Sequence, residues 1–228
     1  MNGVTIPPAI VERVRARRGT DHPFARLEPR RTALVVIDLQ NGFMDEAVGH
    51  AVCPAARDIV PNVNRLAGAV RVCGGGVFWV ANTYDPSWTT IADMATQEGR
   101  RRREASMSEG TVGHRLWPAL DVRAEDEVVR KYRFSAFLPG ASDLPNRLRV
   151  RGYDTVLICG TVTNVCCESS ARDAMMTNFR VVMVSDGNAA MTQDEHDASL
   201  VALYLSFADV MDTDMVVGRL ETTVARAA

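Results

Sequence analysis

Short apolar runs without polar alternation are the feature of this sequence that most constrains its fold. Three of them occupy residues 33–37, 77–81 and 181–184. Such runs are typical of strands buried on both faces of a parallel sheet. Between them lie segments with helical periodicity, such as residues 54–73, where apolar side chains recur at spacings of three and four. This alternation predicts an α/β fold: a single doubly wound domain with a central, mostly parallel six-stranded sheet flanked by helices.

The pattern divides the chain into an N-terminal arm, residues 1–30, and one domain, residues 31–228. The arm is either solvated or packed on a partner subunit, and we expect a homo-oligomer, a dimer or a tetramer. Residues 86–116 form a long polar stretch, which indicates local helices or a functional loop. Strands are predicted at residues 32–39, 77–81, 127–131, 154–159, 181–184 and 210–217. Helices are predicted at residues 9–18, 54–73, 143–151 and 192–207, with another that begins at Thr163 or Asn164.

Composition excludes several classes of partner. Of the 228 residues 46% are apolar and 24% are charged, which is ordinary for a globular protein. The net charge of -2 gives no reason to expect nucleic acid or an anionic membrane. No apolar run approaches the ~20 residues of a membrane span, and the first 20 residues lack the apolar core of a signal peptide. The five cysteines match no zinc pattern, so we expect free thiols in a cytoplasmic protein.

The stretch 157–174 joins a predicted strand to a predicted helix and carries a candidate nucleophile. Gly160 ends the strand, and Cys166 falls in the first turn of the helix. Unpaired backbone N–H groups and the helix dipole predict a thiol pKa below the reference of about 8.5. The same N–H groups, near Val162 and Cys166, can hold an oxyanion. The alternative is that Cys166 is a small buried apolar residue.

Two charged residues stand at the ends of other predicted strands. Asp38 follows the first strand, and Lys131 ends the third. Because the carboxyl ends of parallel strands share one edge of a sheet, these residues can meet Cys166 there. Asp38 would take the thiol proton as general base, and Lys131 would lower the thiol pKa and keep Asp38 ionised. Taken singly, Asp38 could instead cap a turn, and Lys131 could be solvated.

Three motifs in this order resemble the isochorismatase-like cysteine hydrolases over residues 32–217. Residues 38–43 resemble the family's D-x-Q-N-x-F segment, Lys131 with residues 135–137 its lysine strand, and residues 160–173 its nucleophile turn. The resemblance implies a catalytic triad of Asp38, Lys131 and Cys166 with no obligatory cofactor. It also implies a cis peptide between Thr161 and Val162 and an oxyanion hole formed by the N–H groups of Val162 and Cys166.

Departures from the family pattern favour one subgroup. Nicotinamidases of the family carry metal-binding histidines after the second strand, and residues 82–88 contain none, so we expect no metal. Cys166 is present, whereas relatives that cleave a vinyl ether often lack the cysteine. The motifs are most similar to ureidoacrylate and N-carbamoyl amidohydrolases, which implies a small amide or ureide substrate. A vinyl ether hydrolase and a non-catalytic binding protein remain alternatives.

Several residues near the strand ends are candidate substrate contacts. Asn82 and Tyr84 could hydrogen-bond a polar substrate, and Arg133 could bind its carboxylate or be solvated. The arginines at 100–103 form either a solvated run or an anion site. Cys167 is interpreted as a packing residue. The full candidate set is Phe43, Asn82, Tyr84, Trp88, Arg133, Phe137 and Asn164, with core packing as the alternative for its aromatic members.

Overall fold

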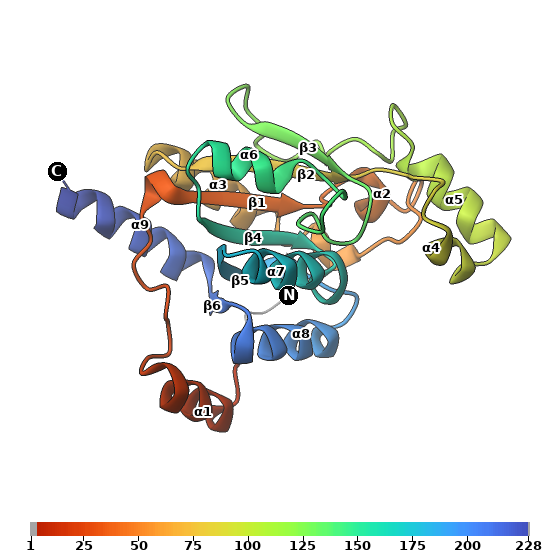
Figure 1. Cartoon of the computed structure of the whole chain (residues 1–228). Coiled ribbons are helices and arrows are strands. Elements are labelled where there is room, and N and C mark those ends of the chain that lie inside the picture. The colour runs from red at the N-terminus through yellow and green to blue at the C-terminus, as the bar shows by residue number, and fades with distance from the viewer. Residues whose placement is uncertain (1–3, 228) are drawn as a thin grey trace.

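The computed structural model describes residues 4–227 and contains one six-stranded sheet in the order β3–β2–β1–β4–β5–β6 (Figure 1). Every neighbouring pair of these strands is parallel, which confirms the α/β fold and makes the sheet more regular than predicted. The strands are β1 (Thr32–Ile37), β2 (Gly76–Asn82), β3 (Glu127–Lys131), β4 (Thr155–Thr161), β5 (Arg180–Ala189) and β6 (Asp209–Met211).

Helices cover both faces of the sheet, as expected for strands that are apolar throughout. Alternate residues of β1 point into two separate cores: Leu34 and Val36 into one, Ala33 and Val35 into the other. The first core is closed by α3 and α9, and the second by α6, α7, α8 and α1. The helices are α1 (Pro8–Arg18), α2 (Asn41–Met44), α3 (Val60–Val72), α4 (Thr89–Asp93), α5 (Gln97–Met107), α6 (Leu144–Val150), α7 (Glu168–Met176), α8 (Gln193–Ser206) and α9 (Thr213–Ala227).

The strand order reverses between β1 and β4. The first strand, β1, lies in the middle of the sheet. The chain then adds β2 and β3 on one side of β1 and returns to place β4 on its other side. In sheets of this kind the crevice for ligands lies beyond the carboxyl ends of the strands at the point of reversal. Helices α4 and α5, from the long polar stretch, lie beyond that edge (Figure 1).

The predicted last strand at residues 210–217 is wrong over most of its length. Only Asp209–Met211 is a strand, and α9 begins at Thr213. The Asp186 carboxylate accepts hydrogen bonds from both the backbone N–H and the hydroxyl of Thr213, each at 2.8 Å. Val216, Val217 and Leu220 pack into the core from a helix, and a short apolar run alone does not distinguish a helix from a strand. The predicted helix at 54–73 also begins later, at Val60, after a 3₁₀ turn at Pro54–Ala56.

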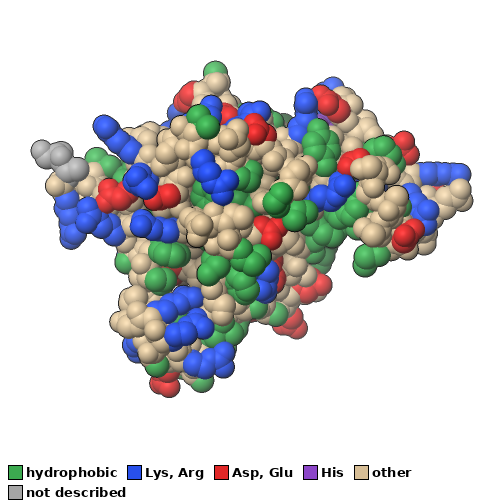
Figure 2. Space-filling model, in the orientation of Figure 1, with side chains coloured by type: hydrophobic (Ala, Val, Ile, Leu, Met, Phe, Trp, Pro, Cys, Tyr) green, Lys and Arg blue, Asp and Glu red, His purple; other side chains and the backbone are tan. Residues whose placement is uncertain are grey.

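The N-terminal segment packs on its own chain. Val14 on α1 is buried, and the hydroxyl of Tyr204 on α8 donates a hydrogen bond to the carbonyl of Asp21 at 3.0 Å. Further along, Nδ1 of His22 lies 2.9 Å from the buried Asp209 carboxylate of β6. Arg13, Arg15 and Arg17 of α1 are exposed, and blue side chains gather around this part of the molecule in Figure 2.

Candidate active site

Asp38 directly follows β1 and is completely buried. Its backbone has a φ of 57°, in the left-handed region, which Asp adopts more readily than most residues. Its N–H donates to the carbonyl of Val80 at 2.9 Å, and its carbonyl accepts from the N–H of Gln40 at 2.8 Å. The Gln40 side chain accepts from the N–H of Asn82 at 2.7 Å and donates to the carbonyl of His114 at 2.8 Å. These bonds hold the ends of β1 and β2 in one fixed arrangement around the Asp38 carboxylate.

Lys131 reaches Asp38 from the edge of the sheet. It is the last residue of β3, which β2 separates from β1. Its Nζ lies 2.9 Å from Oδ2 of Asp38, and both side chains have no exposed surface. Nζ also donates to the carbonyl of Arg133 at 3.1 Å. Lysine and aspartate are almost never fully buried unless they are paired, and buried pairs of this kind cluster at functional sites, so Asp38 and Lys131 are candidate site residues.

Cys166 comes to the same place from the other side of β1. Gly160 permits β4 to approach β1 closely: its φ is 127°, and a Cβ there would lie 2.0 Å from the carbonyl oxygen of Ile37. The following peptide, Thr161–Val162, is cis, as the resemblance implies. A π-helical turn, Thr163–Cys167, then leads into α7. The thiol of Cys166 is buried, and it lies close enough to Asp38 and Lys131 for both to act on its pKa.

The electrostatics of this cluster differ from the sequence-based expectation. Burial, and then the charge of Asp38, raise the pKa of the Cys166 thiol, and Lys131 only partly offsets them. Burial also raises the pKa of Asp38 against the opposing effect of Lys131. Burial alone would lower the pKa of Lys131, but the negative charges of Asp38 and Cys166 outweigh it and raise that pKa. The predicted low thiol pKa is therefore wrong, because the π-helical turn lies inside the protein and loses the solvation a thiolate needs.

The thiol lies at a cavity of about 410 Å³ beyond the carboxyl edge of the sheet. Three of the seven predicted contacts line it with Cys166, namely Phe43, Asn82 and Asn164, and so does Val162, the predicted oxyanion donor. The loop residue His50 and residues of α4, α5 and the start of α8 complete the wall. These further residues are His50, Ala51, Ile91, Met94, Ala95, Gly99, Arg103, Phe134, Val165, Met191 and Glu195.

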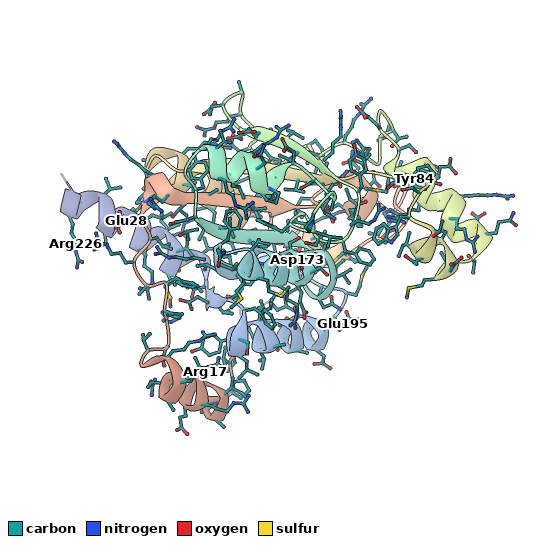
Figure 3. The ribbon with its side chains drawn as sticks, viewed as in Figure 1. Arg17, Glu28, Tyr84, Asp173, Glu195 and Arg226 are labelled. Atoms are coloured by element: carbon teal, nitrogen blue, oxygen red, sulfur yellow. The ribbon has the colours of Figure 1, made fainter. Side chains whose placement is uncertain are left out.

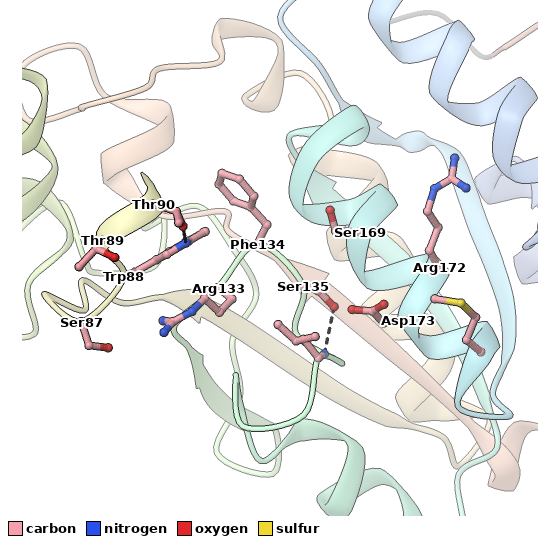
Figure 4. A pocket seen from close by; sticks show the side chains of 12 residues that line it. Ser87, Trp88, Thr89, Thr90, Arg133, Phe134, Ser135, Ser169, Arg172 and Asp173 are labelled. Atoms are coloured by element: carbon pink, nitrogen blue, oxygen red, sulfur yellow. Dashed lines mark hydrogen bonds between the residues drawn. The ribbon is translucent and has the colours of Figure 1, made fainter. Parts of the chain in front are cut away.

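Four other predicted contacts lie elsewhere. Phe137 is buried in the core against Phe179, with ring centroids 5.3 Å apart. Tyr84 packs against the other core. Trp88 and Arg133 line a neighbouring polar groove beside α7 (Figure 4). In the groove Arg133 pairs with Asp85 at 2.7 Å, so its charge is already neutralised.

The sequence predicted local helices or a functional loop at residues 86–116, and α4 and α5 are such helices. It did not single out the residues of α4 and α5 that line the cavity, and within these two helices only Ser106 and Met107, at the end of α5, are buried. A usable signal was present in the spacing of Gly99 and Arg103, which places both on the same face of a helix. Figure 3 shows Tyr84 beside α5 and Glu195 at the start of α8, both on the side of the molecule where the strands end.

His50 is a second titratable group in the cavity wall. Burial, and then the charge of Arg103, lower the pKa of His50 to about 4, so the ring is neutral near pH 7. Its ring packs edge-on against Phe43, with centroids 5.0 Å apart. Among residues 4–227, no group of three His, Cys, Asp or Glu side chains is arranged to hold a metal ion. Within the same range no helix has the length and apolar character to cross a membrane.

A doubly wound α/β sheet with a buried cysteine, lysine and aspartate at its point of reversal makes this protein a candidate cysteine hydrolase. Residues 32–215 match the model of the isochorismatase domain, and the chain belongs to the isochorismatase family. The match leaves all of α1 and most of α9 outside.

Individual relatives differ in what their names say of activity. A probable inactive nicotinamidase of Arabidopsis thaliana is 31% identical over 174 residues, 75% of this chain and 87% of the relative. The ureidoacrylate amidohydrolase RutB of Methylobacterium radiotolerans is 29% identical over 205 residues, 82% of this chain and 78% of the relative. The crystal structure of a cysteine hydrolase from Pseudomonas syringae pv. phaseolicola 1448A matches with a TM-score of 0.77 at 28% identity, over 86% of this chain and 95% of that one.

Proposed function

We propose that this protein is a cysteine-dependent hydrolase of a small amide, ureide or N-carbamoyl compound. The observation that carries the proposal is the meeting of Asp38, after β1, and Lys131, at the end of β3, with Cys166, whose thiol lines the cavity. The similarity to a ureidoacrylate amidohydrolase supports carbon–nitrogen bond cleavage. The free cysteines support a reducing, cytoplasmic setting. We also propose a homo-oligomer as the working state.

The geometry suits a two-step reaction that starts from a neutral thiol. Sγ of Cys166 bonds to the carbonyl carbon of the substrate while the thiol proton passes to the Asp38 carboxylate. A carboxylate with a raised pKa is a better proton acceptor, and it sits against the thiol. The carbon–nitrogen bond then breaks as Asp38 returns the proton to the leaving ammonia or amine, and a thioester remains on Cys166.

Water completes the cycle by attacking the thioester. Asp38 accepts a proton from the water as its oxygen bonds to the carbonyl carbon, and the carbon–sulfur bond breaks as Cys166 regains that proton. Lys131 keeps its positive charge throughout and stabilises the negative charge that moves between Asp38 and Cys166. The N–H groups of Val162 and Cys166 are the proposed donors to the oxyanion in both steps.

Two alternatives follow from specific observations. A vinyl ether hydrolase fits the same sheet and family. A non-catalytic binding protein fits the similarity to a probable inactive nicotinamidase. The buried Asp38–Lys131 pair beside Cys166 favours an active hydrolase. Burying two charges costs desolvation free energy, and a site that only binds a ligand does not require that cost.

The test is a panel of small amides, ureides and N-carbamoyl compounds scored for ammonia, beside isochorismate scored for pyruvate. We expect ammonia release from at least one carbon–nitrogen substrate, and loss of that activity by at least about 10³-fold in Cys166→Ser. Cys167→Val is the matched control, because Cys167 is the adjacent buried thiol and packs in the core. Pyruvate release alone, or equal activity in Cys166→Ser, would contradict the proposal.

A further inference from the structure

Arg103 differs from the other arginines of the 100–103 run in the direction it faces. In α5, Gly99, Arg103 and Met107 are four residues apart and share one side of the helix. Gly99 and Arg103 line the cavity, and Met107 anchors the end of the helix in the core. The other three, Arg100, Arg101 and Arg102, are exposed. One half-buried guanidinium therefore faces the same space as the Cys166 thiol.

The Arg103 charge has no anionic partner within the described part of the chain. The neighbouring arginines are paired: Arg102 lies 3.1 Å from Glu98, and Arg133 lies 2.7 Å from Asp85. No Asp or Glu among residues 4–227 lies within ion-pair distance of Arg103, whose contact is a cation–π interaction with Trp88 at 4.9 Å. Glu195 lines the same cavity, but its carboxylate accepts the N–H of Thr192 at 3.0 Å in the capping box of α8.

The remaining groups around the cavity do not compensate for this charge. Lys131 is paired with Asp38, and His50 is neutral near pH 7. Burial lowers the pKa of Arg103, while the negative charge of Cys166 acts in the opposite direction. Arginine keeps its proton in proteins. The cavity therefore presents one permanent cation to whatever molecule reaches the thiol.

We propose that Arg103 binds a carboxylate of the substrate, so that the substrate is a small carboxylic acid that also carries the scissile amide or ureido group. The guanidinium offers a planar fork that matches a carboxylate with two parallel hydrogen bonds. Trp88 supports its face, and the cavity of about 410 Å³ admits only a small molecule between it and Cys166. This assigns to Arg103 the role that the sequence had suggested for Arg133. The substrate class rests on the proposed function, whereas the anion site does not.

Two reagents of nearly equal size test the site without a known substrate. Iodoacetate and iodoacetamide both alkylate Cys166, and they differ in the presence of a carboxylate. We expect Arg103→Met to lower the ratio of the two rates at Cys166, iodoacetate over iodoacetamide, by roughly tenfold, as for loss of a charge-assisted hydrogen bond. Arg103→Lys should fall between, because lysine keeps the charge but not the fork. The rates are read by mass spectrometry of the peptide that contains Cys166.

Arg101→Met is the matched control, because Arg101 carries the same charge on the same helix but is exposed. Its ratio should equal that of the unsubstituted protein. An unchanged ratio in folded Arg103→Met overturns the proposal. An equal fall of the ratio in Arg103→Met and Arg101→Met also overturns it, since that result would reflect only the total positive charge of the helix.

A second measurement separates this proposal from the proposed function. The pair is 3-ureidopropionate and N-propylurea, which differ in the carboxylate and are scored for ammonia. Arg103→Met should raise KM for the acid by about tenfold more than it changes KM for the neutral compound. If the alkylation ratio falls but no amide or ureide is hydrolysed, the proposed function fails and the anion site stands. If Arg103→Met has the same ratio of the two KM values as the unsubstituted protein, the anion site fails and the hydrolase stands.

Discussion

Asp38 and Lys131 act on the Cys166 thiol in opposite directions. The negative charge of Asp38 raises the pKa of the thiol, and the positive charge of Lys131 lowers it. We expect Lys131→Met to slow alkylation of Cys166 at a fixed, mildly alkaline pH, and Asp38→Asn to speed it. Both variants should lose turnover, since Asp38→Asn leaves no group to carry the proton. The measurement is the rate of iodoacetamide alkylation, with thermal melting to confirm that each variant folds.

Unshifted alkylation rates in both folded variants would mean that the three side chains do not interact. The two variants control for each other, because each breaks the same buried ion pair. Lys131→Met removes a positive charge beside the thiol, whereas Asp38→Asn removes a negative one. A general loosening of the site would shift both rates in the same direction. Opposite shifts therefore identify the charges themselves as the cause.

His50 makes the stability of the protein depend on acid pH. Its pKa is about 4 in the folded protein, first because of burial and then because of Arg103, against an ordinary value of 6.5. Between these two pH values the unfolded chain binds more protons than the folded one, so the free energy of unfolding falls as pH falls from 6.5 to 4. We expect His50→Gln to make this fall less steep. Urea unfolding at several pH values in that window checks the prediction, and an equal slope in both proteins would contradict it.

At the scale of elements, the close approach of β4 to β1 depends on Gly160. A Cβ at this position would lie 2.0 Å from the Ile37 carbonyl oxygen, in a backbone with φ 127°. We expect Gly160→Ala to lower the free energy of unfolding by more than about 3 kcal/mol, because backbone atoms must move. Gly140→Ala is the control: Gly140 also has a positive φ, 79°, but a Cβ there would meet nothing within 4 Å. That variant should lose only about 1–2 kcal/mol, and equal losses by urea unfolding would show that contact with β1 is unimportant.

The elements that could be predicted are those with a strong local signal. Apolar runs located the central strands, and the positions of Asp38, Lys131 and Cys166 at strand ends brought them together once the sheet was parallel. The residues that depend on tertiary contacts were not predictable. Trp88 and Arg133 pair with each other and with Asp85 instead of facing the thiol. The burial of the π-helical turn, which reverses the expected thiol pKa, also has no local sequence signal.

The site itself combines elements of different rigidity. Asp38 directly follows β1, Lys131 ends β3, and Cys166 lies in the buried π-helical turn after β4. Backbone hydrogen bonds hold Asp38, and Nζ of Lys131 donates to the carbonyl of Arg133. By contrast, α4 has no buried residue, and α5 is anchored only by its last residues. Few buried contacts mean a low free energy of local opening. The proposed reacting groups are therefore held at the edge of the sheet, and the part of the cavity wall formed by α4 and α5 is the part free to adapt.

At the scale of the whole molecule, α1 extends the second core beyond the family domain. The matched domain begins at residue 32, yet Val14 on α1 is 1% exposed and belongs to the same core as Leu200 and Leu203 on α8. Sequence reasoning left open whether residues 1–30 pack on a partner subunit. Contacts within one chain predict that the arm stabilises each copy separately.

Val14→Ala tests this contribution of the arm. Removing two buried carbon atoms should lower the free energy of unfolding by about 1–2 kcal/mol, which for a chain of this size lowers Tm by roughly 2–8 °C. Arg13→Ala, an exposed change one residue away on the same helix, should leave Tm within about 1 °C. Both values come from thermal unfolding at two protein concentrations at least tenfold apart. If α1 packs on its own chain, the difference in Tm between Val14→Ala and the unsubstituted protein is the same at both concentrations, because no association step is involved. A difference that grows on dilution would place Val14 between subunits instead.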